Sequence, residues 1–531
     1  MSPTPSSNSF AIDFGTSNTA IARWNAATQK AELVRLNSLC QQFSAQPPLI
    51  PSLLYVEDAA AQKVIAGQTL RDRGLDFSKN SRFFRNFKRG IGTPIQGFLP
   101  ELDGNQISFE QVGTWFLQEL ISNLQRETTG DIESLVLTVP VDSFESYRNW
   151  LLDICQSWEV PQVSIIDEPT AAALGYGITN DDLLLVVDFG GGTIDLALVQ
   201  LDDDPQGYLL RQGEQIQGTD QPKSTARVIA KAGDNLGGAD IDNWLTDYFA
   251  TTQNLSKSSL TTRLAEKLKI KLSEVEAAQE VYFDDETFET YRLELDRPGF
   301  EALLQEQGFF ERLDNLMNQV LQQAQRNDIS IDDIDSVLLV GGSVKIPAVQ
   351  SWVKQYFDEA QIKNQLQSEA IALGALQVSQ AVEIEDFLHH SYGIRFWNRR
   401  TNSHDWHPII EAGEFYPLEE PVELRLGASV PEQPKIELIL GEISPDTSTE
   451  VYFDGDRLMT RTITTSKITV QPLNDREGAR TIAQLDPLGY PGSDRLQLLF
   501  DVDWERQLLI TVNDLVTGES LLTNYIVAKL N

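Results

Sequence analysis

Two short stretches of this 531-residue chain share one design: Asp13-Phe14-Gly15-Thr16-Ser17-Asn18-Thr19-Ala20 and Asp188-Phe189-Gly190-Gly191-Gly192-Thr193-Ile194-Asp195. In each, an apolar strand ends in Asp-Phe, a tight turn of Gly and small hydroxyl residues follows, and a second apolar strand begins. The copies lie about 175 positions apart. An internal repeat of this kind predicts a duplicated α/β unit with a cleft between its halves.

Glycine-rich turns suit phosphate binding, because backbone N–H groups approach the anion with no Cβ in the way, and Thr or Ser hydroxyls add donors. Two facing turns would hold both ends of a triphosphate tail. Asp13 and Asp188, at the ends of their strands, would then hold a hydrated Mg²⁺, which keeps most of its waters. The alternative is a pair of ordinary hairpins in which the Asp side chains cap the turns. The duplication favours the phosphate site.

Two other nucleotide-binding motifs are excluded. No Gly-x-x-x-x-Gly-Lys-[Ser/Thr] P-loop occurs in the sequence. The Rossmann fingerprint opens a helix, whereas both of these turns join one strand to another.

A third glycine element, residues 337–347, places an apolar strand before Gly341-Gly342-Ser343, and a helix is expected from Pro347. Backbone here would pass close to a flat ligand such as a nucleoside. A helix expected over residues 262–279 supports this interpretation. Its buried stripe would be Leu264, Leu268, Leu272 and Val275, and its opposite face would carry Glu266, Lys269 and Ser273. The alternative is that this polar face is only solvated surface.

The composition is that of a strongly acidic globular chain, with 42 Lys and Arg against 78 Asp and Glu and a net charge of −36. Nucleic acid and anionic membranes attract clustered Lys and Arg, so neither is an expected partner. No stretch resembles a signal peptide or approaches the roughly 18 apolar residues of a spanning helix. Two cysteines, Cys40 and Cys155, fit a reducing compartment. We therefore expect a cytoplasmic protein.

The texture of the sequence changes near residues 381–390. Before it, strand-like runs alternate with amphipathic helical stretches, which is typical of an α/β domain. After it, short alternating runs between turn clusters predict an all-β domain. We expect an α/β domain at 1–380, a linker at 381–390 and a β-domain at 391–531. The expected helices are 109–126, 143–158, 239–249, 262–279, 300–326 and 348–357, and the expected strands include 10–14, 20–24, 135–139, 163–166, 183–189, 196–201, 337–340, 422–426, 435–440, 460–470, 496–503 and 508–512.

These motifs resemble those of the seventy-kilodalton heat-shock chaperones of the DnaK type, in the actin-like ATPase superfamily. The resemblance implies an α/β actin-like ATPase domain of two lobes around a nucleotide cleft, followed by an all-β sandwich. The matching segments occur in family order: Ile12-Asp13-Phe14-Gly15-Thr16-Ser17-Asn18, Asp167-Glu168-Pro169-Thr170-Ala171-Ala172-Ala173-Leu174-Gly175-Tyr176-Gly177, residues 188–195, Gly233-Asp234-Asn235-Leu236-Gly237-Gly238-Ala239-Asp240-Ile241-Asp242, and Val340-Gly341-Gly342-Ser343.

The resemblance also assigns roles to residues of this sequence. It implies Lys88, Glu168, Asp188 and Thr193 as catalytic residues, with Asp13 and Asp188 holding Mg²⁺ through water. Pro140 and Arg148 match a proline and an arginine that relay the nucleotide state toward the linker. The ATP- or ADP-binding residues that it implies are Gly15, Thr16, Ser17, Asn18, Gly190, Gly191, Gly192, Thr193, Gly237, Gly238, Glu266, Lys269, Ser273, Gly341, Gly342, Ser343 and Lys345.

The C-terminal part resembles the family less closely. Residues 409–417 and 485–518 look like strands of the sandwich that binds peptides. The chain reaches residue 531 without the helical lid of typical members, so we expect fast peptide release. At the position of the family's interdomain linker this chain has Glu385-Asp386-Phe387-Leu388-His389-His390. This segment is less apolar than the run of Leu in the family's linker. We therefore expect weakened or differently tuned coupling between the domains.

The leading interpretation is an ATP-dependent chaperone of the DnaK type, a stress-response ATPase acting on exposed apolar peptide segments of client proteins. A J-domain co-chaperone and a nucleotide exchange factor are the partners that the resemblance implies. A first alternative is an ATP-gated adaptor or regulatory protein with one fixed partner. A second is a small-molecule kinase on the same scaffold, against which the β-domain weighs.

Overall fold

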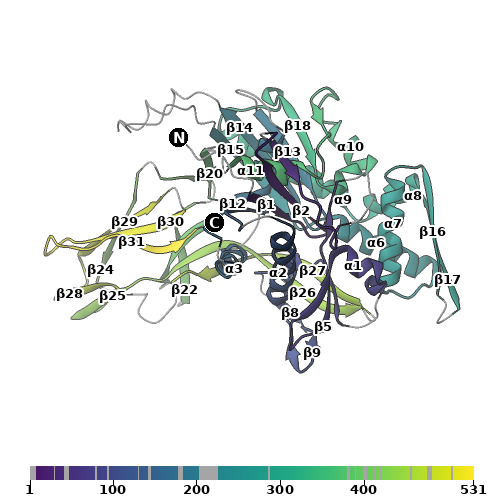
Figure 1. Ribbon diagram of the computed structural model, residues 1–531. Coiled ribbons are helices and arrows are strands. Elements are labelled where there is room, and N and C mark those ends of the chain that lie inside the picture. Colours follow the sequence, from purple (N-terminus) through teal and green to yellow (C-terminus); the bar gives the residue numbers. More distant parts are fainter. Residues whose placement is uncertain are drawn as a thin grey trace. The chain divides into compact units, whose positions relative to one another are not determined.

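The computed structural model of the chain (Figure 1) divides into two compact units. Unit 1 comprises residues 1–384 and 449–462, and unit 2 comprises residues 385–448 and 463–531. The structure describes all residues except 1–7, 29, 41–46, 78–80, 93–94, 98, 129–130, 141–144, 159, 177–182, 203–224, 285–287, 379–382, 389, 399–402, 412–413, 419, 455–456, 475–480, 504–505 and 531.

Lobe I of unit 1, residues 8–176, is built on one mixed sheet. Its strands in spatial order are β12 (Gln162–Asp167), β11 (Ser134–Val139), β1 (Ser9–Phe14), β2 (Asn18–Asn25) and β3 (Lys30–Leu33), with β4 (Ile50–Pro51) paired to β2. Every second residue of β1, namely Phe10, Ile12 and Phe14, enters a core shared with α2 (Phe109–Glu127) and α3 (Glu145–Gln156). Because β1 and β2 pair as an antiparallel hairpin, the first glycine turn lies at the end of this sheet.

Lobe II, residues 183–378, contains the second copy of the hairpin. Its strands in spatial order are β19 (Ile362–Lys363), β18 (Ser336–Val340), β13 (Leu183–Phe189), β14 (Ile194–Asp202) and β15 (Thr225–Asp234). In both lobes the first hairpin strand pairs antiparallel with the second and parallel with a third, which is β11 in lobe I and β18 in lobe II. The main helices of lobe II are α6 (Gly238–Gln253), α7 (Ser259–Leu272), α9 (Phe309–Arg326) and α10 (Pro347–Val353).

Two short helices, α4 (Glu168–Gly175) and α11 (Ala370–Val378), share one apolar cluster with strands of both sheets. The helices approach very closely, since a Cβ added at Gly374 would lie 1.8 Å from the Ala171 carbonyl oxygen. A Cβ added at Gly175 would likewise lie 2.0 Å from the Ala370 carbonyl oxygen. Glycine is required at this crossing because no side chain fits between the two backbones.

Smaller elements complete unit 1. They are β5 (Leu53–Asp58), β6 (Lys63–Ala66), α1 (Gly67–Asp72), η1 (Leu75–Phe77), β7 (Phe83–Arg85), η2 (Phe87–Gly90), β8 (Ile95–Gly97), β9 (Glu101–Leu102), β10 (Asn105–Gln106), β16 (Ala277–Asp284), β17 (Glu289–Asp296), α8 (Arg297–Glu306), η3 (Ile331–Asp333) and η4 (Gly342–Lys345), where η marks a 3-10 turn. Within the described ranges, no helix is long and apolar enough to cross a membrane.

Unit 2 consists of strands and turns in its described residues. One sheet has the order β24 (Val422–Gly427), β29 (Asp494–Val502), β30 (Gln507–Asp514) and β31 (Ser520–Lys529). Its inward residues, such as Leu498, Phe500 and Ile510, form the core with residues of the other strands. The other strands of unit 2 are β21 (Ser391–Asn398), β22 (Ser403–Ile410), β23 (Phe415–Tyr416), β25 (Gln433–Glu437), β28 (Thr481–Gly489) and those parts of β26 (Leu440–Asp454) and β27 (Arg457–Pro472) that lie outside residues 449–462. The expected linker, 381–390, contains β20 (Glu383–Phe387), and its residues 381, 382 and 389 lie outside the described part.

Three expected helices and one expected strand differ from the structure. The helix expected over 348–357 ends at Val353 as α10, and the strand expected over 435–440 is interrupted between β25 and β26. The helix expected over 262–279 ends at Leu272, because the chain turns after it and residues 277–284 pair as β16 with β17. Val275, expected in the buried stripe, is 47% exposed. The helix expected over 300–326 is two helices, α8 and α9, separated by Gly308 in the left-handed conformation at φ 68°.

The α4–α11 crossing gives a stability prediction. Gly374→Ala should lower the free energy of unfolding of unit 1 by about 1–3 kcal/mol, because the added methyl overpacks a backbone contact. Thermal unfolding measures it. Gly342→Ala is the matched control, since its Cβ would meet no atom within 4 Å and its melting temperature should stay near that of the wild type. Equal melting temperatures for the two variants would contradict the crossing.

Candidate nucleotide site

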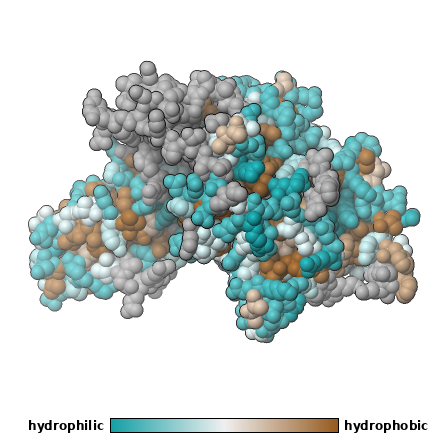
Figure 2. All heavy atoms as spheres, in the orientation of Figure 1, coloured by the Kyte–Doolittle hydropathy of each residue, from teal (hydrophilic) through white to brown (hydrophobic). Residues whose placement is uncertain are grey.

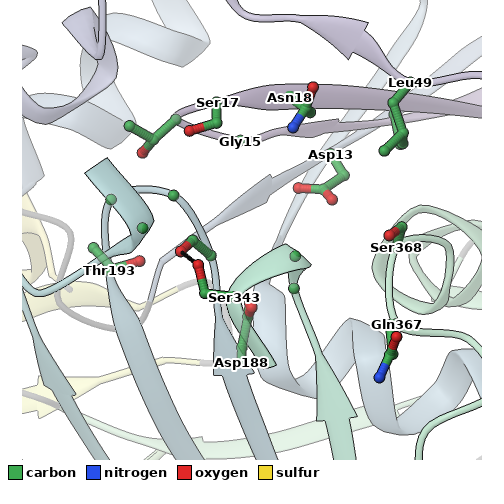
Figure 3. Close-up of a pocket in the computed structure, with 18 of the residues that line it drawn as sticks. Asp13, Gly15, Ser17, Asn18, Leu49, Asp188, Thr193, Ser343, Gln367 and Ser368 are labelled. Atoms are coloured by element: carbon green, nitrogen blue, oxygen red, sulfur yellow. Dashed lines mark hydrogen bonds between the residues drawn. The ribbon is translucent and has the colours of Figure 1, made fainter. Parts of the chain in front are cut away.

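The two glycine turns meet at one cavity in unit 1 (Figure 3). A Cβ added at Gly191 would lie 2.0 Å from Ser17 Oγ, and one added at Gly192 would lie 2.2 Å from Thr16 Oγ1. The second turn therefore packs directly on the hydroxyl residues of the first. This contact brings the two copies of the repeat together, as the sequence predicts.

Each turn has backbone carbonyls that are bonded to surrounding groups. In the first turn, Ser52 Oγ donates to the Gly15 carbonyl oxygen at 2.7 Å, and the Ser52 N–H donates to the Ser17 carbonyl oxygen at 2.9 Å. The carbonyl and the following N–H of a trans peptide point in opposite directions. The N–H groups of Thr16 and Asn18 are therefore turned away from Ser52.

The second turn is bonded in the same way. The Gly190 carbonyl oxygen accepts from Ser343 Oγ at 2.8 Å and from the Gly238 N–H at 3.1 Å, and the Gly191 carbonyl oxygen accepts from the Ala239 N–H at 2.9 Å. The Gly191 and Gly192 N–H groups consequently point away from these partners. A run of amides turned to one side of a glycine turn is the arrangement that binds anions.

Three carboxyl groups and one ammonium line the cavity beside the turns: Asp13, Asp188, Glu168 and Lys88. Lys88 Nζ donates to Glu168 Oε1 at 2.8 Å, and both side chains are buried. Burial, together with the nearby Glu168 carboxylate, raises the pKa of Asp13 to about 7. Burial and the surrounding carboxylates also raise the pKa of Asp188 well above its usual value. The cluster therefore carries more carboxyl groups than cations, and a bound cation would relieve their repulsion.

The Lys88 ammonium is held by its surroundings as a cation. It lies 5.6 Å from the centroid of the Phe14 ring and 6.0 Å from that of Tyr147. Burial alone lowers the pKa of Lys88, but Glu168, Tyr147 and Asp13 together outweigh it and raise that pKa above its usual range. Burial raises the pKa of the Tyr147 hydroxyl to about 12. At neutral pH this lysine presents a fixed positive charge beside the cavity.

The polar face of α7 turns into the same cavity, where Glu266, Lys269 and Ser273 all line the wall. Lys269 Nζ lies 2.8 Å from Asp242 Oδ1 and donates to the Gly238 carbonyl oxygen at 2.7 Å. Glu266 Oε2 lies 2.9 Å from Arg263 Nη1 and Glu266 Oε1 lies 3.5 Å from Arg71 Nη2. Burial would raise the pKa of Glu266, but the surrounding cations, Arg263 foremost, lower it to about 2. The alternative of a merely solvated face is excluded.

Most of the expected site residues are brought together. Those that line the cavity are Asp13, Gly15, Thr16, Ser17, Asn18, Lys88, Glu168, Asp188, Gly190, Gly191, Gly192, Thr193, Gly238, Glu266, Lys269, Ser273, Gly341, Gly342 and Ser343. Gly237 and Lys345 are not among them, and Lys345 is exposed at the end of η4. A Cβ added at Gly237 would lie 2.4 Å from the Gly191 carbonyl, so Gly237 supports the turn from outside.

Other cavity residues were not predicted from the sequence. They are Ala20, Leu49, Asp242, Ile270, Ile346, Gln367, Ser368 and Ile371. Figure 3 shows Leu49, Gln367 and Ser368 on the other side of Asp13 and Asp188 from Ser17 and Thr193. Asp242 lies two residues after Asp240 in a matched segment, and its burial beside Lys269 could have been inferred from the polar face of α7. Gln367 and Ser368 precede α11 and belong to no motif.

Pro140 and Arg148 lie outside the cavity lining. Pro140 is buried directly after β11. Arg148 Nη2 donates to Asp167 Oδ1 at 2.6 Å, and Lys231 Nζ lies 3.9 Å from Asp167 Oδ2. Asp167 immediately precedes Glu168. Arg148 is thus connected through Asp167 to the residue next to a cavity carboxylate.

Comparison with known proteins identifies the family. The family model described as Hsp70 protein matches residues 96–388, which is more than half of the chain. The chain belongs to the Hsp70 family. A chaperone protein DnaK from Deinococcus deserti is 33% identical over 294 residues, covering 52% of this chain and 43% of that protein.

Two further Hsp70 relatives extend the comparison. A chaperone protein dnaK from Trieres chinensis is 31% identical over 418 residues. The match covers 71% of this chain and 62% of the Trieres protein. A mitochondrial heat shock 70 kDa protein from Pisum sativum is 32% identical over 291 residues. The match covers 52% of this chain and 39% of the pea protein. The chain thus spans less than half the length of the Deinococcus and pea relatives. The resemblance of the motifs to this family is confirmed.

The ion pairs of Glu266 give a prediction of pH dependence. The folded pKa of about 2 lies below the ordinary 4.5, so the ionised carboxylate stabilises the fold above pH 4.5, and this stabilisation is lost as pH falls toward 2. Glu266→Gln should therefore cost up to about 3 kcal/mol at pH 7, and the difference from wild type should shrink between pH 5 and pH 2. Denaturant unfolding across this range measures it.

The control for this experiment is the exposed Glu274, just after α7. Glu274→Gln should leave unfolding unchanged throughout the pH range. A Glu266→Gln deficit that is the same at pH 7 and pH 3 would contradict the ion-pair explanation.

Proposed function

We propose that this Hsp70-family chain is an ATP-hydrolysing chaperone of the DnaK type, which uses ATP hydrolysis to control its binding of exposed apolar peptide segments. The observation that carries the proposal is the meeting of two glycine turns at one cavity, with backbone amides turned away from their bonded carbonyls. A net charge of −36 gives the protein no general attraction for ATP. Backbone amides supply the attraction locally instead.

Within this proposal the actin-like lobes hold ATP or ADP between them. The turns at 15–18 and 190–193 grip the phosphates. The adenosine lies between the polar face of α7 and the Gly341-Gly342-Ser343 turn, whose glycines leave room for a flat ring. Lys345 is proposed at the outer edge, since its side chain is exposed.

A magnesium ion fits the carboxyl groups of the site. Asp13 and Asp188 have raised pKa values because burial and neighbouring carboxylates disfavour their charged forms, and a divalent cation would restore those forms. Among the described residues no three such side chains gather closely enough to hold a metal directly, and the ion proposed here keeps most of its waters. When bound, Mg²⁺ would neutralise negative charge on the phosphates.

The protein's own groups would act around the transferred phosphoryl group. Glu168 is proposed to orient the attacking water. Lys88, which is buried and remains charged, would stabilise the charge that develops on the phosphoryl oxygens. Thr193 would add a hydroxyl donor at the end of its turn. Pro140 and Arg148 would relay the nucleotide state, Arg148 through its contact with Asp167.

Unit 2 is proposed to bind the client peptide by strand-like pairing at a sheet edge. Apolar side chains on its surface support this, and Figure 2 shows hydrophobic residues over its visible face. The large exposed apolar residues there are Phe396, Val430, Leu488, Tyr490, Leu515, Val516, Tyr525 and Ile526. A J-domain co-chaperone and a nucleotide exchange factor are the proposed partner proteins. The proposed role is in a cytoplasmic stress response, and no nucleic-acid or membrane partner is proposed.

The metal assignment predicts the effect of Asp188→Asn. The variant should lose Mg²⁺-dependent ATP hydrolysis by about 100-fold or more, because the amide removes a negative charge beside the phosphates. Single-turnover hydrolysis with excess protein measures it. Asp332→Asn, at an exposed position in η3, should hydrolyse ATP at the wild-type rate. Unchanged turnover in Asp188→Asn would remove the active-site assignment.

The chaperone proposal predicts coupling between nucleotide and client. An apolar peptide should raise the single-turnover rate, and its affinity should differ between the ATP and ADP states. Fluorescence anisotropy of a labelled peptide measures the affinity, and an acidic peptide of equal length is the control. If neither rate nor affinity changes, the chaperone proposal fails and the adaptor with a fixed partner becomes the better description.

A further inference from the structure

The 3-10 turn η2 carries two consecutive cations that have different partners. The Lys88 ammonium bonds to Glu168, within lobe I, whereas the Arg89 guanidinium bonds to groups of lobe II. The turn itself is fixed in lobe I. Phe87 is 1% exposed in the lobe I core, and a Cβ added at Gly90 would lie 2.2 Å from the Phe109 ring.

The Arg89 guanidinium crosses to lobe II and is almost fully buried, with 3% of its side chain exposed. Its Nη2 donates to the Gly192 carbonyl oxygen at 2.8 Å and to the Asn235 carbonyl oxygen at 2.9 Å. The same nitrogen donates to Asp240 Oδ2 at 2.6 Å, while Nη1 donates to Asp240 Oδ1 at 3.0 Å. This is the two-point pairing of a guanidinium with a carboxylate, extended by two backbone acceptors.

The bond from Arg89 to Gly192 differs from the other bonds to the second turn, because it comes from lobe I. The Gly190 and Gly191 carbonyls are bonded by groups of lobe II itself, namely Ser343, Gly238 and Ala239. The Gly192 carbonyl is bonded by lobe I, through Arg89. Because the Gly192–Thr193 peptide is planar and trans, fixing its carbonyl toward Arg89 directs the Thr193 N–H the opposite way.

We propose that Arg89 is a positioning residue that completes the phosphate-binding turn only when the two lobes are closed together. When Arg89 is in place, the last peptide of the turn is oriented and the Thr193 N–H is directed toward the phosphate. When the lobes separate, Gly192 loses this partner and the peptide is free to rotate. The inference rests on the proposed nucleotide site and adds a reason why phosphate binding and lobe closure favour each other.

A purely structural ion pair is the competing explanation. Asp240 also accepts from the Gly237 N–H at 2.8 Å and belongs to the cap of α6, so an Arg89–Asp240 pair would hold the lobes together without any effect on Gly192. The two explanations separate when the backbone contact and the ion pair are disturbed independently. Arg89→Lys keeps a cation for Asp240, but a single ammonium does not reproduce the planar fork that also reaches Gly192 and Asn235.

The experiment compares the affinities for ADP and adenosine in wild type, Arg89→Lys and Asp240→Asn, by isothermal titration calorimetry with Mg²⁺. The ratio of the two affinities reports what the phosphates add. Arg89→Lys should reduce this ratio about tenfold, with adenosine affinity nearly unchanged. Asp240→Asn, which leaves both backbone acceptors in place, should reduce it by no more than about threefold. Arg82→Lys, at an Arg–Asp pair with Asp103 outside the cavity, should keep the wild-type ratio.

The outcomes decide between the explanations. A wild-type ratio in Arg89→Lys overturns the inference, and so does an equal loss in Arg89→Lys and Asp240→Asn, which assigns the effect to the ion pair. If Arg89→Lys melts below the assay temperature, Arg89→Gln is measured instead. The Gln side-chain amide offers only one of the two backbone contacts and no charge. A wild-type affinity ratio in Arg89→Gln would overturn the inference equally.

The proposed function is decided separately in the same preparation. Wild-type protein that binds ADP more tightly than adenosine but does not hydrolyse ATP in a single turnover removes the ATPase and leaves the role of Arg89 standing. Wild-type protein that binds the two ligands equally overturns both.

Discussion

The direct packing of one glycine turn on the other is the constraint on which the cavity depends. A single methyl group at Gly191 or Gly192 would collide with the hydroxyl residues of the first turn, so the two hairpins meet only because the second turn lacks side chains where Thr16 and Ser17 pack on it. The meeting point brings Asp13 and Asp188 to one side and leaves the remaining polar groups of the turns to bind a ligand. Amides turned to one side of such turns would give an acidic protein a local site for an anion without a basic surface.

The charged groups of the cavity differ between its two walls. Four ionisable groups beside the turns, of which Asp13 is half-buried and the others are buried, are arranged so that one lysine stays positive and two aspartates resist ionisation. Such an arrangement is costly without a ligand, and the cation and phosphates of the proposed function would make it favourable. On the far wall the opposite holds, because Glu266 is fully compensated by Arg263 and Arg71 without a ligand. The charges on the wall with Asp13 and Asp188 are thus not balanced without a ligand, whereas those on the wall with Glu266 are.

The sequence predicted the parts of the fold that repeat or alternate. The hairpins, the strands at 135–139 and 337–340 and the helix at 109–126 are confirmed, because buried apolar periodicity dictates them. The end of α7 was missed, since residues 273–276 contain no Gly or Pro and only the pairing of β16 with β17 ends the helix. Arg89 and Asp242 were not predicted as partners, because a basic residue beside Lys88 and an acid in a helix are ordinary surface patterns until the tertiary contacts are known.

The crossing of α4 and α11 has a consequence for motion. At their closest approach the facing residues are Ala171, Gly175, Ala370 and Gly374, which carry at most one methyl group each. A contact with small residues at its centre can slide with less repacking than one between long side chains, which suits a shear motion between the two sheets. Glu168 is the first residue of α4. Any sliding at this plane would move that carboxylate together with the helix, and in the proposed function this displaces the group that orients the attacking water.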